Sequence, residues 1–132
     1  MLREAAPADI PRVRELMLSV PGFWDPGWPA DVLERVVAAD AAITLVYENG
    51  TTLSGFICGY DVGFRGYLSE LVVSPGAQGT GIGSLLLAEL ERRLAARGCP
   101  LVIADVWRDA EGFYRRRGWA PPDTVLLRKR FP

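Results

Sequence analysis

The sequence predicts an α/β protein with a mixed β-sheet, and two patterns carry this prediction. Two strand-like runs flank Glu48-Asn49-Gly50-Thr51, and an Asn-Gly pair at this place is typical of a tight turn between antiparallel strands. Farther along, two apolar runs enclose a long amphipathic helical pattern, and such a crossover joins parallel strands. At 132 residues the chain has the length of one compact domain, so we expect a single domain spanning residues 1–132.

The N-terminal part is predicted to hold one short strand and two helices. Residues 2–5 indicate the strand, and Pro7-Ala8-Asp9 then supplies turn and helix-capping residues. A helix follows, and a second helix is predicted for residues 31–39, where Pro29 suits the first turn. Between them, residues 20–28 contain too many prolines and glycines for a regular element, so we expect a structured loop. The apolar positions at helical spacing are Ile10, Val13, Leu16 and Met17 in the first helix, and Val32, Leu33, Val36 and Val37 in the second.

The middle of the chain is predicted to form three antiparallel strands. Residues 42–47 and 53–61 are rich in Ile, Val, Leu and Phe and lie on either side of the Asn-Gly turn. Gly63-Phe64-Arg65-Gly66 turns the chain again, and residues 67–73 form the next strand. These strands therefore make a meander.

The C-terminal half is predicted to contain the crossover, a further helix and a last strand. The long helix shows apolar residues at every fourth position and ends before Gly98; these residues are Ile82, Leu86, Leu90 and Leu94. Residues 101–106 are apolar except for Asp105, which predicts the strand parallel to residues 67–73. Residues 109–117 predict a helix ended by Gly118, and residues 125–131 predict a final strand.

Composition and charge exclude several classes of function. Fifteen Lys and Arg residues against sixteen Asp and Glu give a formal charge of −1, which offers no basic field for nucleic acid. The sequence has no histidine, so it lacks Ser-His-Asp and Cys-His pairs and the commonest zinc sites, and we expect no metal. No apolar stretch is long enough to span a membrane. The N-terminus lacks a secretory apolar run, and Cys58 and Cys99 are expected as reduced thiols, so we expect a soluble cytoplasmic protein.

The segment Gln78-Gly79-Thr80-Gly81-Ile82-Gly83 joins a predicted strand to the strongest predicted helix. Glycines let a ligand approach the backbone closely, and the first amides of a helix are unpaired and lie at the positive end of its dipole. Such a turn suits an anion such as a pyrophosphate. The spacing matches neither the Gly-x-Gly-x-x-Gly of dinucleotide-binding folds nor the Gly-Lys-Ser/Thr of phosphate-binding loops. The glycines also fit a purely structural role, in which they permit tight packing of strand and helix.

This segment resembles the Gln/Arg-x-x-Gly-x-Gly/Ala signature of the GNAT superfamily of N-acyltransferases, and the preceding Val72-Val73-Ser74-Pro75 is similar too. Residues 110–119, Ala-Glu-Gly-Phe-Tyr-Arg-Arg-Arg-Gly-Trp, resemble the family's Ala-x-x-Phe-Tyr-x-x-x-Gly-Phe. The resemblance implies the GNAT fold, a mixed splayed central sheet flanked by helices, with acetyl-CoA as cosubstrate and an amine as acceptor. It places CoA between the strand ending at Val73 and the strand of residues 101–106. The CoA-binding residues that it implies are Val72, Val73, Gln78, Gly79, Thr80, Gly81, Ile82, Gly83, Ser84 and Trp107.

The resemblance also implies direct attack of an amine on the thioester, which needs a base, a polarised carbonyl and a proton donor. Tyr114, matching the family's Tyr, is the candidate acid for the leaving thiolate. Glu70 follows Leu68 and Ser69 on an otherwise apolar strand and is the candidate base, because partial burial raises the pKa of a carboxylate. The amide of Val73 is a candidate donor to the thioester carbonyl. Glu70 also fits a solvated edge carboxylate or an ion-pair partner, and Tyr114 also fits a core tyrosine.

One position departs from the family pattern, because Trp107 stands where many relatives have Asn. The nearby arginines fit either phosphate contacts or a solvated helix face; they are Arg108, Arg115, Arg116 and Arg117. In the loop of residues 20–28, the aromatic residues fit either a wall for an amine acceptor or core positions; they are Phe23, Trp24 and Trp28. Asp25 and Asp31 are candidates for negative charge beside a cationic acceptor.

Three functions therefore remain open on the sequence. An N-acetyltransferase for a small-molecule amine is favoured. A protein or peptide N-terminal acetyltransferase is the second, and it needs an open groove for an extended chain. A non-catalytic CoA-binding module is the third, and the presence of both Glu70 and Tyr114 weighs against it. A homodimer is left open.

Overall fold

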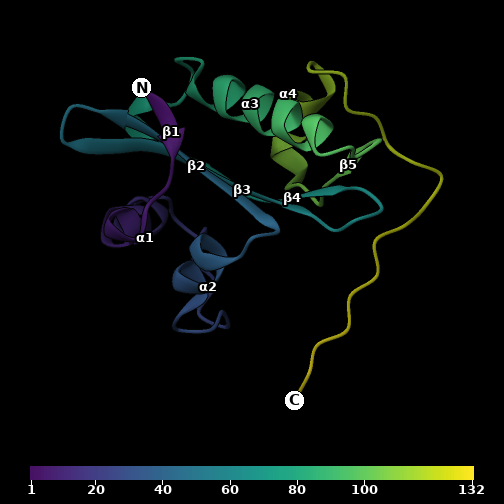
Figure 1. The fold of residues 1–132 in the computed structure, drawn as a ribbon, viewed down its shortest axis with the longest axis horizontal. Coiled ribbons are helices and arrows are strands. Elements are labelled where there is room, and N and C mark those ends of the chain that lie inside the picture. Colours follow the sequence, from purple (N-terminus) through teal and green to yellow (C-terminus); the bar gives the residue numbers. More distant parts are fainter.

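The computed structural model describes all 132 residues, and its centre is one five-stranded sheet (Figure 1). The strands follow the order β1-β2-β3-β4-β5; the pairs β1-β2, β2-β3 and β3-β4 are antiparallel, and β5 runs parallel to β4. Their bounds are β1 Leu2–Glu4, β2 Ala42–Asn49, β3 Thr52–Asp61, β4 Gly66–Val73 and β5 Val102–Ile103. The predicted α/β class and mixed sheet are therefore confirmed.

Helices cover both faces of this sheet (Figure 1). On one face lie α1 (Ile10–Ser19) and α2 (Val32–Ala38), and on the other lie α3 (Ile82–Ala96) and α4 (Glu111–Arg115). Three short 3-10 turns complete the list of elements: η1 (Pro7–Asp9), η2 (Pro75–Ala77) and η3 (Arg108–Ala110). None of the helices combines the length and apolarity that crossing a bilayer requires.

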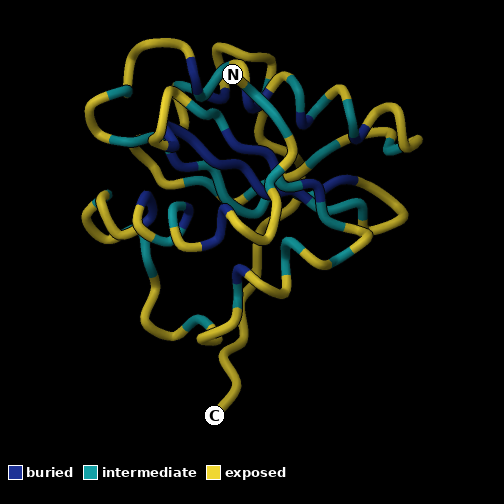
Figure 2. The backbone as a smooth tube through the Cα atoms, turned by 60° about the vertical axis from the view of Figure 1, so that its left-hand side comes forward, coloured by how far each residue is buried: buried dark blue, intermediate teal, exposed yellow.

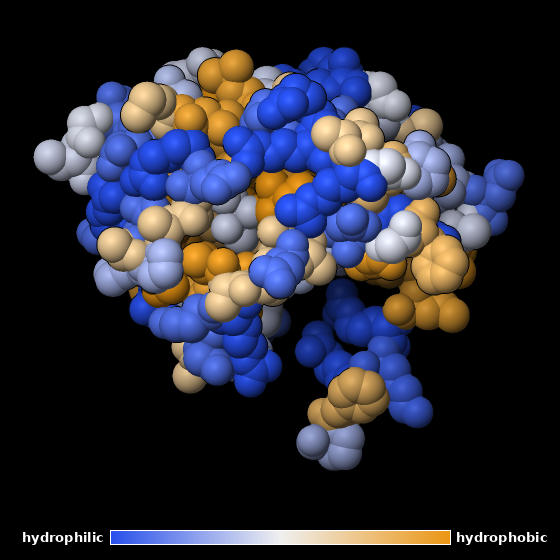
Figure 3. All heavy atoms as spheres, viewed as in Figure 1, coloured by the Kyte–Doolittle hydropathy of each residue, from blue (hydrophilic) through white to orange (hydrophobic).

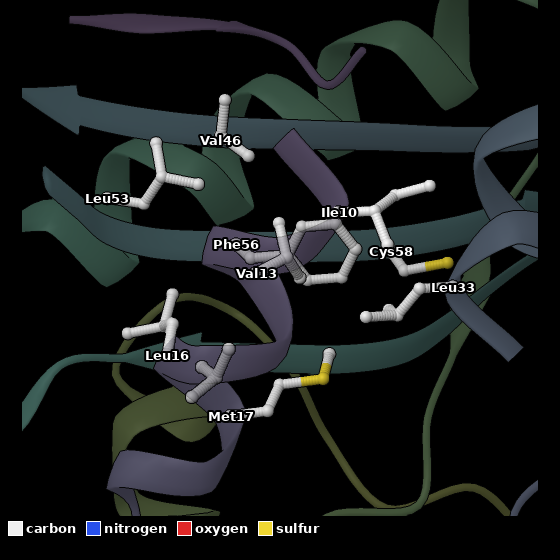
Figure 4. Packing of buried hydrophobic residues seen from close by; sticks show 10 residues of the cluster. Ile10, Val13, Leu16, Met17, Leu33, Val46, Leu53, Phe56 and Cys58 are labelled. Atoms are coloured by element: carbon white, nitrogen blue, oxygen red, sulfur yellow. The ribbon is translucent and has the colours of Figure 1, made fainter. Parts of the chain in front are cut away.

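Each face of the sheet carries its own hydrophobic core. On the α1 and α2 face, Val13, Met17 and Leu33 pack with Phe56 of β3 (Figure 4). All four apolar positions predicted for α1 are buried. Figure 2 shows the buried backbone concentrated in the middle of the molecule, with exposed loops around it. The loop of residues 20–28 contains no helix or strand, as predicted.

Glycines in the sheet allow α3 to pack closely on the opposite face. A Cβ added at Gly55 would lie 2.7 Å from Leu86, and one at Gly59 would lie 2.6 Å from Leu90. One at Gly66 would lie 2.7 Å from Leu94. The leucines that recur every fourth residue along α3 therefore each lie over a glycine of β3 or β4, and this contact fixes where the N-terminus of α3 lies relative to β4.

A buried carboxylate joins the N-terminal elements. Asp9 is 3% exposed, and its two oxygens accept hydrogen bonds from the side chains of Arg3 and Arg12 and from the amide of Ala6. Both arginines also pair with Glu48 of β2. These bonds, led by the one from Arg3, hold the pKa of Asp9 well below its usual range.

The structure corrects three predictions in the C-terminal part. β5 contains two residues rather than six, because only Val102 and Ile103 find partners on β4. α4 is shorter than the predicted helix over residues 109–117, and its first turn is the 3-10 turn η3; Gly118 ends it as predicted, at φ +90°. The predicted final strand at residues 125–131 is wrong. Residues 120–132 form no helix or strand and are exposed, and none of them pairs with a strand of the sheet.

Candidate active site

A cleft opens where β4 separates from β5. Cys58 lies opposite Glu70 and Gly59 lies opposite Leu68, so Ser69 is an extra residue in β4 and forms a β-bulge. A bulge bends its strand and increases the local twist. Pairing between β4 and β5 covers only two residues of each strand, all before the bulge. Beyond it the strands part, and the space between them is lined by residues 68–73 of β4, residues 105–107 and Tyr114 of α4.

Glu70 lines this cleft and has an unusual proton affinity. Burial, and then the negative charge of Asp105, raise the pKa of the Glu70 carboxyl to about 7. A general base is most effective when its pKa lies near the working pH. The prediction of a partly buried carboxylate with a raised pKa therefore agrees with the structure, and its role in the reaction stays a prediction.

Asp105 is a cleft residue that the sequence analysis missed. Its carboxylate accepts a hydrogen bond of 2.5 Å from the hydroxyl of Tyr67, and that bond adds to burial in raising the pKa of the tyrosine. A signal for it exists in the sequence, because the carboxyl ends of parallel strands meet at one edge of a sheet. Asp105 follows the apolar residues 101–104, which run parallel to β4, so this rule places it near Glu70. Asp25 and Asp31, the acidic residues that were considered, do not line the cleft.

Tyr114 reaches the same cleft from α4. Its ring is buried and makes edge contacts with Phe113, at 5.0 Å between ring centroids, and with Trp119, at 5.3 Å. Burial, and then the charge of Glu70, raise the pKa of Tyr114 to about 12. Its hydroxyl is therefore protonated at neutral pH, as a proton donor must be. The alternative of a core tyrosine agrees in part with the structure as well, because the ring packs in the hydrophobic core between the sheet and α3.

The glycine-rich loop lines a second cavity next to the cleft. Gly79 and Gly81 have φ angles of +81° and +93°, in the left-handed region that favours glycine. The first backbone amide of α3 with a helical acceptor is that of Leu85, so the three amides before it are free to bind an anion. Thr80 forms hydrogen bonds within the loop, because its amide and its hydroxyl both donate to the carbonyl of Ala77. The residues that line both the cleft and this cavity are Leu71, Val73, Gln78, Ala110 and Tyr114.

Backbone groups of β4 also face the cleft. The amide of Ser74 donates to the carbonyl of Ser54, at 2.8 Å, and Gly55 lies opposite Val73. Hydrogen-bonded and non-bonded pairs alternate along antiparallel strands, so Val73 turns its amide and carbonyl away from β3. Leu71, two residues earlier, does the same, whereas Val72 turns its backbone groups toward β3. The carbonyl of Val73 accepts a hydrogen bond from the side chain of Gln78 at 3.2 Å.

Comparisons with known proteins agree with this geometry. The model of the "Acetyltransferase (GNAT) family" matches residues 10–119. The chain belongs to the GNAT acetyltransferase family. A protein from Yersinia pestis described as an acetyltransferase is 37% identical over 102 residues, covering 74% of this chain and 72% of its own length.

Two solved structures show the GNAT fold of this chain at low sequence identity. A transcriptional regulator from Bacillus halodurans is 19% identical, with a TM-score of 0.83 over 99% of both chains. The aminoglycoside N-acetyltransferase AAC(6')-Iy, solved with CoA, is 16% identical, with a TM-score of 0.79 over 99% of this chain and 100% of its own. The predictions of the GNAT fold and of an acyl-CoA-dependent N-acetyltransferase are therefore confirmed.

Trp107, the departure from the GNAT pattern, lies on the cleft side. It lines the cleft that contains Glu70, and its ring contacts Phe23 edge-on at 5.8 Å between centroids. It does not line the cavity of the glycine-rich loop. Phe23 likewise lines the cleft, and it also packs against the core on the α1 and α2 face, as Trp24 and Trp28 do. The core positions considered for these aromatic residues are therefore occupied, and a wall for an amine acceptor stays a prediction.

Two of the four arginines near α4 lie at the glycine-rich loop of this GNAT domain. Arg116 and Arg117 line its cavity, and Arg117 donates to the hydroxyl of Ser84 at the start of α3. The guanidinium of Arg117 also lies over the ring of Phe113, at 3.8 Å from its centroid. Arg115 instead pairs with Glu111 on the surface of α4. No group of three or more Cys, Asp or Glu side chains is placed to hold a metal ion.

Proposed function

We propose that the protein transfers the acetyl group of acetyl-CoA to a primary amine of a small cationic molecule, by direct attack of the amine on the thioester. The observation that carries this proposal is the cleft between β4 and β5. It contains Glu70, Asp105 and Tyr114, has no Lys or Arg in its lining, and shares wall residues with the cavity of the glycine-rich loop.

The charge of the cleft supports a cationic acceptor. Two carboxylates face the same space, and their mutual repulsion contributes to the raised pKa of Glu70. An arriving ammonium group relieves this repulsion. Phe23 and Trp107 form the aromatic side of the cleft, and aromatic faces attract ammonium groups. The resemblance to the fold of an aminoglycoside acetyltransferase agrees with a small acceptor that carries several amines.

Glu70 and Tyr114 would divide the proton transfers of the reaction. Glu70 accepts a proton from the ammonium form of the acceptor, directly or through water, and so produces the free amine that attacks the thioester. Tyr114 donates its hydroxyl proton as the thiolate leaves. The amide of Val73 or of Leu71 donates to the thioester carbonyl, where negative charge grows during the attack. We therefore add Leu71 to the residues that hold the pantetheine arm, because its backbone faces the cleft and that of Val72 does not.

The remaining contacts to acetyl-CoA are assigned to the loop and to α4. Bound acetyl-CoA supplies the thioester. The free amides at Gly79, Gly81 and the first turn of α3 would hold the pyrophosphate, and Gln78 and Thr80 would shape the loop. Arg116 and Arg117 would add positive charge beside the phosphates. Trp107 is assigned to the acceptor rather than to CoA. The two free cysteines are in keeping with a cytoplasmic setting.

The proposal is tested by a thiol-release assay with acetyl-CoA and a panel of acceptors. The panel contains small diamines and aminosugars, uncharged aromatic amines, and peptides with a free N-terminus. We expect the first group to be acetylated with the highest kcat/KM, and Glu70→Gln to lower that value about 10²-fold at pH 7. Activity confined to the peptides would favour the N-terminal acetyltransferase instead. Binding of acetyl-CoA in a thermal shift assay without turnover of any acceptor would indicate a CoA-binding module.

A further inference from the structure

Two aromatic rings meet at one side of the cleft between β4 and β5. Phe23 comes from the loop that follows α1, and Trp107 comes from the segment that follows β5. Their ring centroids lie 5.8 Å apart at an interplanar angle of 62°, which is an edge contact. Rings in such contact leave no room for a methylene group or a water molecule between them. An acceptor that reaches Glu70 must therefore pass beside this pair of rings, which we call the aromatic bridge.

The aromatic bridge is held in place at both ends. The ring of Phe23 makes an edge contact with Trp28, at 6.3 Å between centroids, and packs against the core on the α1 and α2 face. At the other end, the carbonyl of Trp107 accepts the amide hydrogen bond of Ala110 that closes the turn η3. Packing and a backbone turn therefore position the two rings, and the bridge forms a wall of the cleft.

The space beside the bridge is small. The cleft has a volume of about 190 Å³, whereas the cavity of the glycine-rich loop has about 550 Å³. Pockets for drug-sized ligands measure about 300 to 1,000 Å³, and one water molecule takes about 30 Å³ in the liquid. In the proposed reaction the cleft also holds the acetyl end of acetyl-CoA, because Val73, Gln78 and Tyr114 line it as well. Only a narrow part of an acceptor, such as an unbranched alkyl chain, fits in the space that remains.

The end of the chain does not narrow the cleft further. Residues 120–132 do not line it, and Figure 3 shows the C-terminal segment standing away from the body of the molecule. Phe23 and Trp107 carry the largest side chains on the acceptor side of the cleft, so these two residues set how wide an acceptor can be. Trp107 is 56% exposed, and an alkyl chain can therefore lie along its free face.

The charge of the cleft indicates a second feature of the acceptor. Glu70 and Asp105 both line the cleft, and neither carboxylate takes part in an ion pair of the structure. The hydroxyl of Tyr67 is the one side-chain donor to Asp105. In the proposed reaction Glu70 receives the proton of the attacking amine, so the negative charge of Asp105 is left for another cation. A second ammonium group on the same acceptor would supply that cation.

We propose that the aromatic bridge and Asp105 together make the enzyme selective for unbranched diamines, in which a straight alkyl chain separates the reacting amine from a second ammonium group. This inference rests on the proposed function and narrows its class of acceptors. Phe23 and Trp107 exclude acceptors that carry a ring or a branch next to the amine. Asp105 pairs with the second ammonium group and so favours a diamine over a monoamine of the same length.

The test compares three acceptors in a thiol-release assay with acetyl-CoA. Diaminobutane is unbranched and has two amines, butylamine is unbranched and has one, and diaminocyclohexane has two amines on a ring. We expect kcat/KM for diaminobutane to exceed the value for each of the others about 10-fold or more. Equal values for diaminobutane and diaminocyclohexane would overturn this inference alone. No acetylation of any amine would overturn the proposed function together with it.

Variants of the bridge test which residues exclude the ring. Phe23→Ala and Trp107→Ala should each raise kcat/KM for diaminocyclohexane relative to diaminobutane, by about 10-fold. Trp107 is largely exposed, so its variant tests the bridge even where Phe23→Ala disturbs the core. The matched control is Phe64→Ala, an aromatic residue in the turn between β3 and β4 that is 84% exposed and does not line the cleft. It should leave the ratio unchanged, and an unchanged ratio in Trp107→Ala would contradict the bridge.

Asp105→Asn tests the second ammonium group. The assay is run at about pH 9, where Glu70, with a pKa of about 7, is deprotonated in the wild type. A change in the proton affinity of Glu70 then does not alter the rates. We expect the ratio of kcat/KM between diaminobutane and butylamine to fall about 10-fold or more, toward equality. A ratio that stays at its wild-type value would show that Asp105 does not recognise the second amine.

Discussion

Glu70 and Asp105 lie in the same cleft, and the charge of one changes the proton affinity of the other. The pKa of Glu70 is raised to about 7 by burial and then by Asp105. A base acts in its unprotonated form, so the rate should fall as the pH drops through about 7. Asp105→Asn removes the repulsion but keeps an oxygen that accepts the hydrogen bond of Tyr67. We therefore predict that Asp105→Asn moves the acidic limb of the kcat profile to lower pH.

This first prediction is measured as kcat at saturating amine from pH 5.5 to pH 9, for the wild type and both cleft variants. Glu70→Gln should move the limb to higher pH and lose more rate at neutral than at alkaline pH, because free amine accumulates without a base as the pH rises. Tyr67→Phe serves as a matched control for the loss of a hydrogen bond without loss of charge. An unchanged limb in Asp105→Asn would mean that the limb belongs to another group.

Tyr114→Phe gives a second prediction at the level of one atom. The substitution removes a hydroxyl and leaves the ring that packs between Phe113 and Trp119, so the fold and CoA affinity should persist. The acyl-transfer step should slow by about 10² or less, the low end for a positioned acid. The loss should shrink with an acyl donor whose thiol has a low pKa, because that thiolate leaves readily without a proton. Equal slowing of both donors in single-turnover measurements would contradict the role of acid.

At the residue scale, a site residue could be predicted from the sequence when its own neighbours in the chain indicated its role. Tyr114 was found in a motif, and Glu70 was found as a carboxylate in an apolar strand. Asp105 was missed because its meaning comes from a neighbour 35 positions away in the chain, across the gap between β4 and β5. The backbone of Leu71 was missed because the direction of a strand amide depends on register, which the sequence does not state.

The contact between α3 and the sheet leads to a prediction about packing. A Cβ at Gly59 would lie 2.6 Å from Cδ1 of Leu90, 2.8 Å from its Cδ2 and 3.2 Å from its Cγ, and this side chain is fully buried. Gly59→Ala should therefore cost roughly 1 to 3 kcal/mol of the free energy of unfolding. Gly76→Ala is the matched control, because nothing lies within 4 Å of its added Cβ. Denaturant unfolding of both variants measures the difference, and equal stabilities would show that α3 does not need this glycine.

A substitution at Asp9 tests the ion pairs that connect β1, α1 and β2. Asp9→Asn keeps the shape and the bond from Ala6 but removes the charge that faces Arg3 and Arg12. We expect a loss of about 1 to 3 kcal/mol in unfolding free energy at pH 7. The folded pKa of Asp9 is lowered, so its stabilisation is present above the unfolded pKa of about 3.9 and is lost as the pH falls below it. The gap between variant and wild type should therefore begin to narrow below about pH 4 in denaturant titrations and keep narrowing as the pH falls toward the lowered folded pKa.

At the scale of elements, regular periodicity was predictive and pairing partners were not. The leucines at every fourth position gave α3, and the Asn-Gly pair gave the turn between β2 and β3. The six-residue run at 101–106 became a two-residue strand because the bulge at Ser69 directs β4 away from it. Nothing in the run itself indicates that bulge.

At the scale of the whole molecule, the final strand shows the same limit. The apolar pattern at residues 125–131 is that of a strand, but a strand needs hydrogen bonds to a neighbouring strand, and none of the five strands of the sheet pairs with these residues. Their local pattern therefore does not decide their structure.

Acetyl-CoA should stabilise the whole domain, because a ligand that binds only the folded state shifts unfolding by mass action, by about 2.7 kcal/mol at a hundred times Kd. We predict a rise in Tm with acetyl-CoA or CoA and a much smaller one with NADH or ATP. Gly81→Val should abolish the rise, because a side chain there would occupy the space of the pyrophosphate. The Gly81→Val variant should also have a lower Tm without ligand, because Gly81 has φ +93° and a side chain strains the backbone there.

The control for that strain is Gly50→Val, in the turn between β2 and β3. Gly50 also has a positive φ, +65°, and nothing lies near its added Cβ, but it is far along the chain from the loop and lines neither the cleft nor the cavity. Both variants should unfold at a lower Tm without ligand, and only Gly50→Val should keep the full increase with acetyl-CoA. Differential scanning fluorimetry at several acetyl-CoA concentrations separates the two effects. A normal increase in Gly81→Val would remove the glycine-rich loop from the acetyl-CoA site.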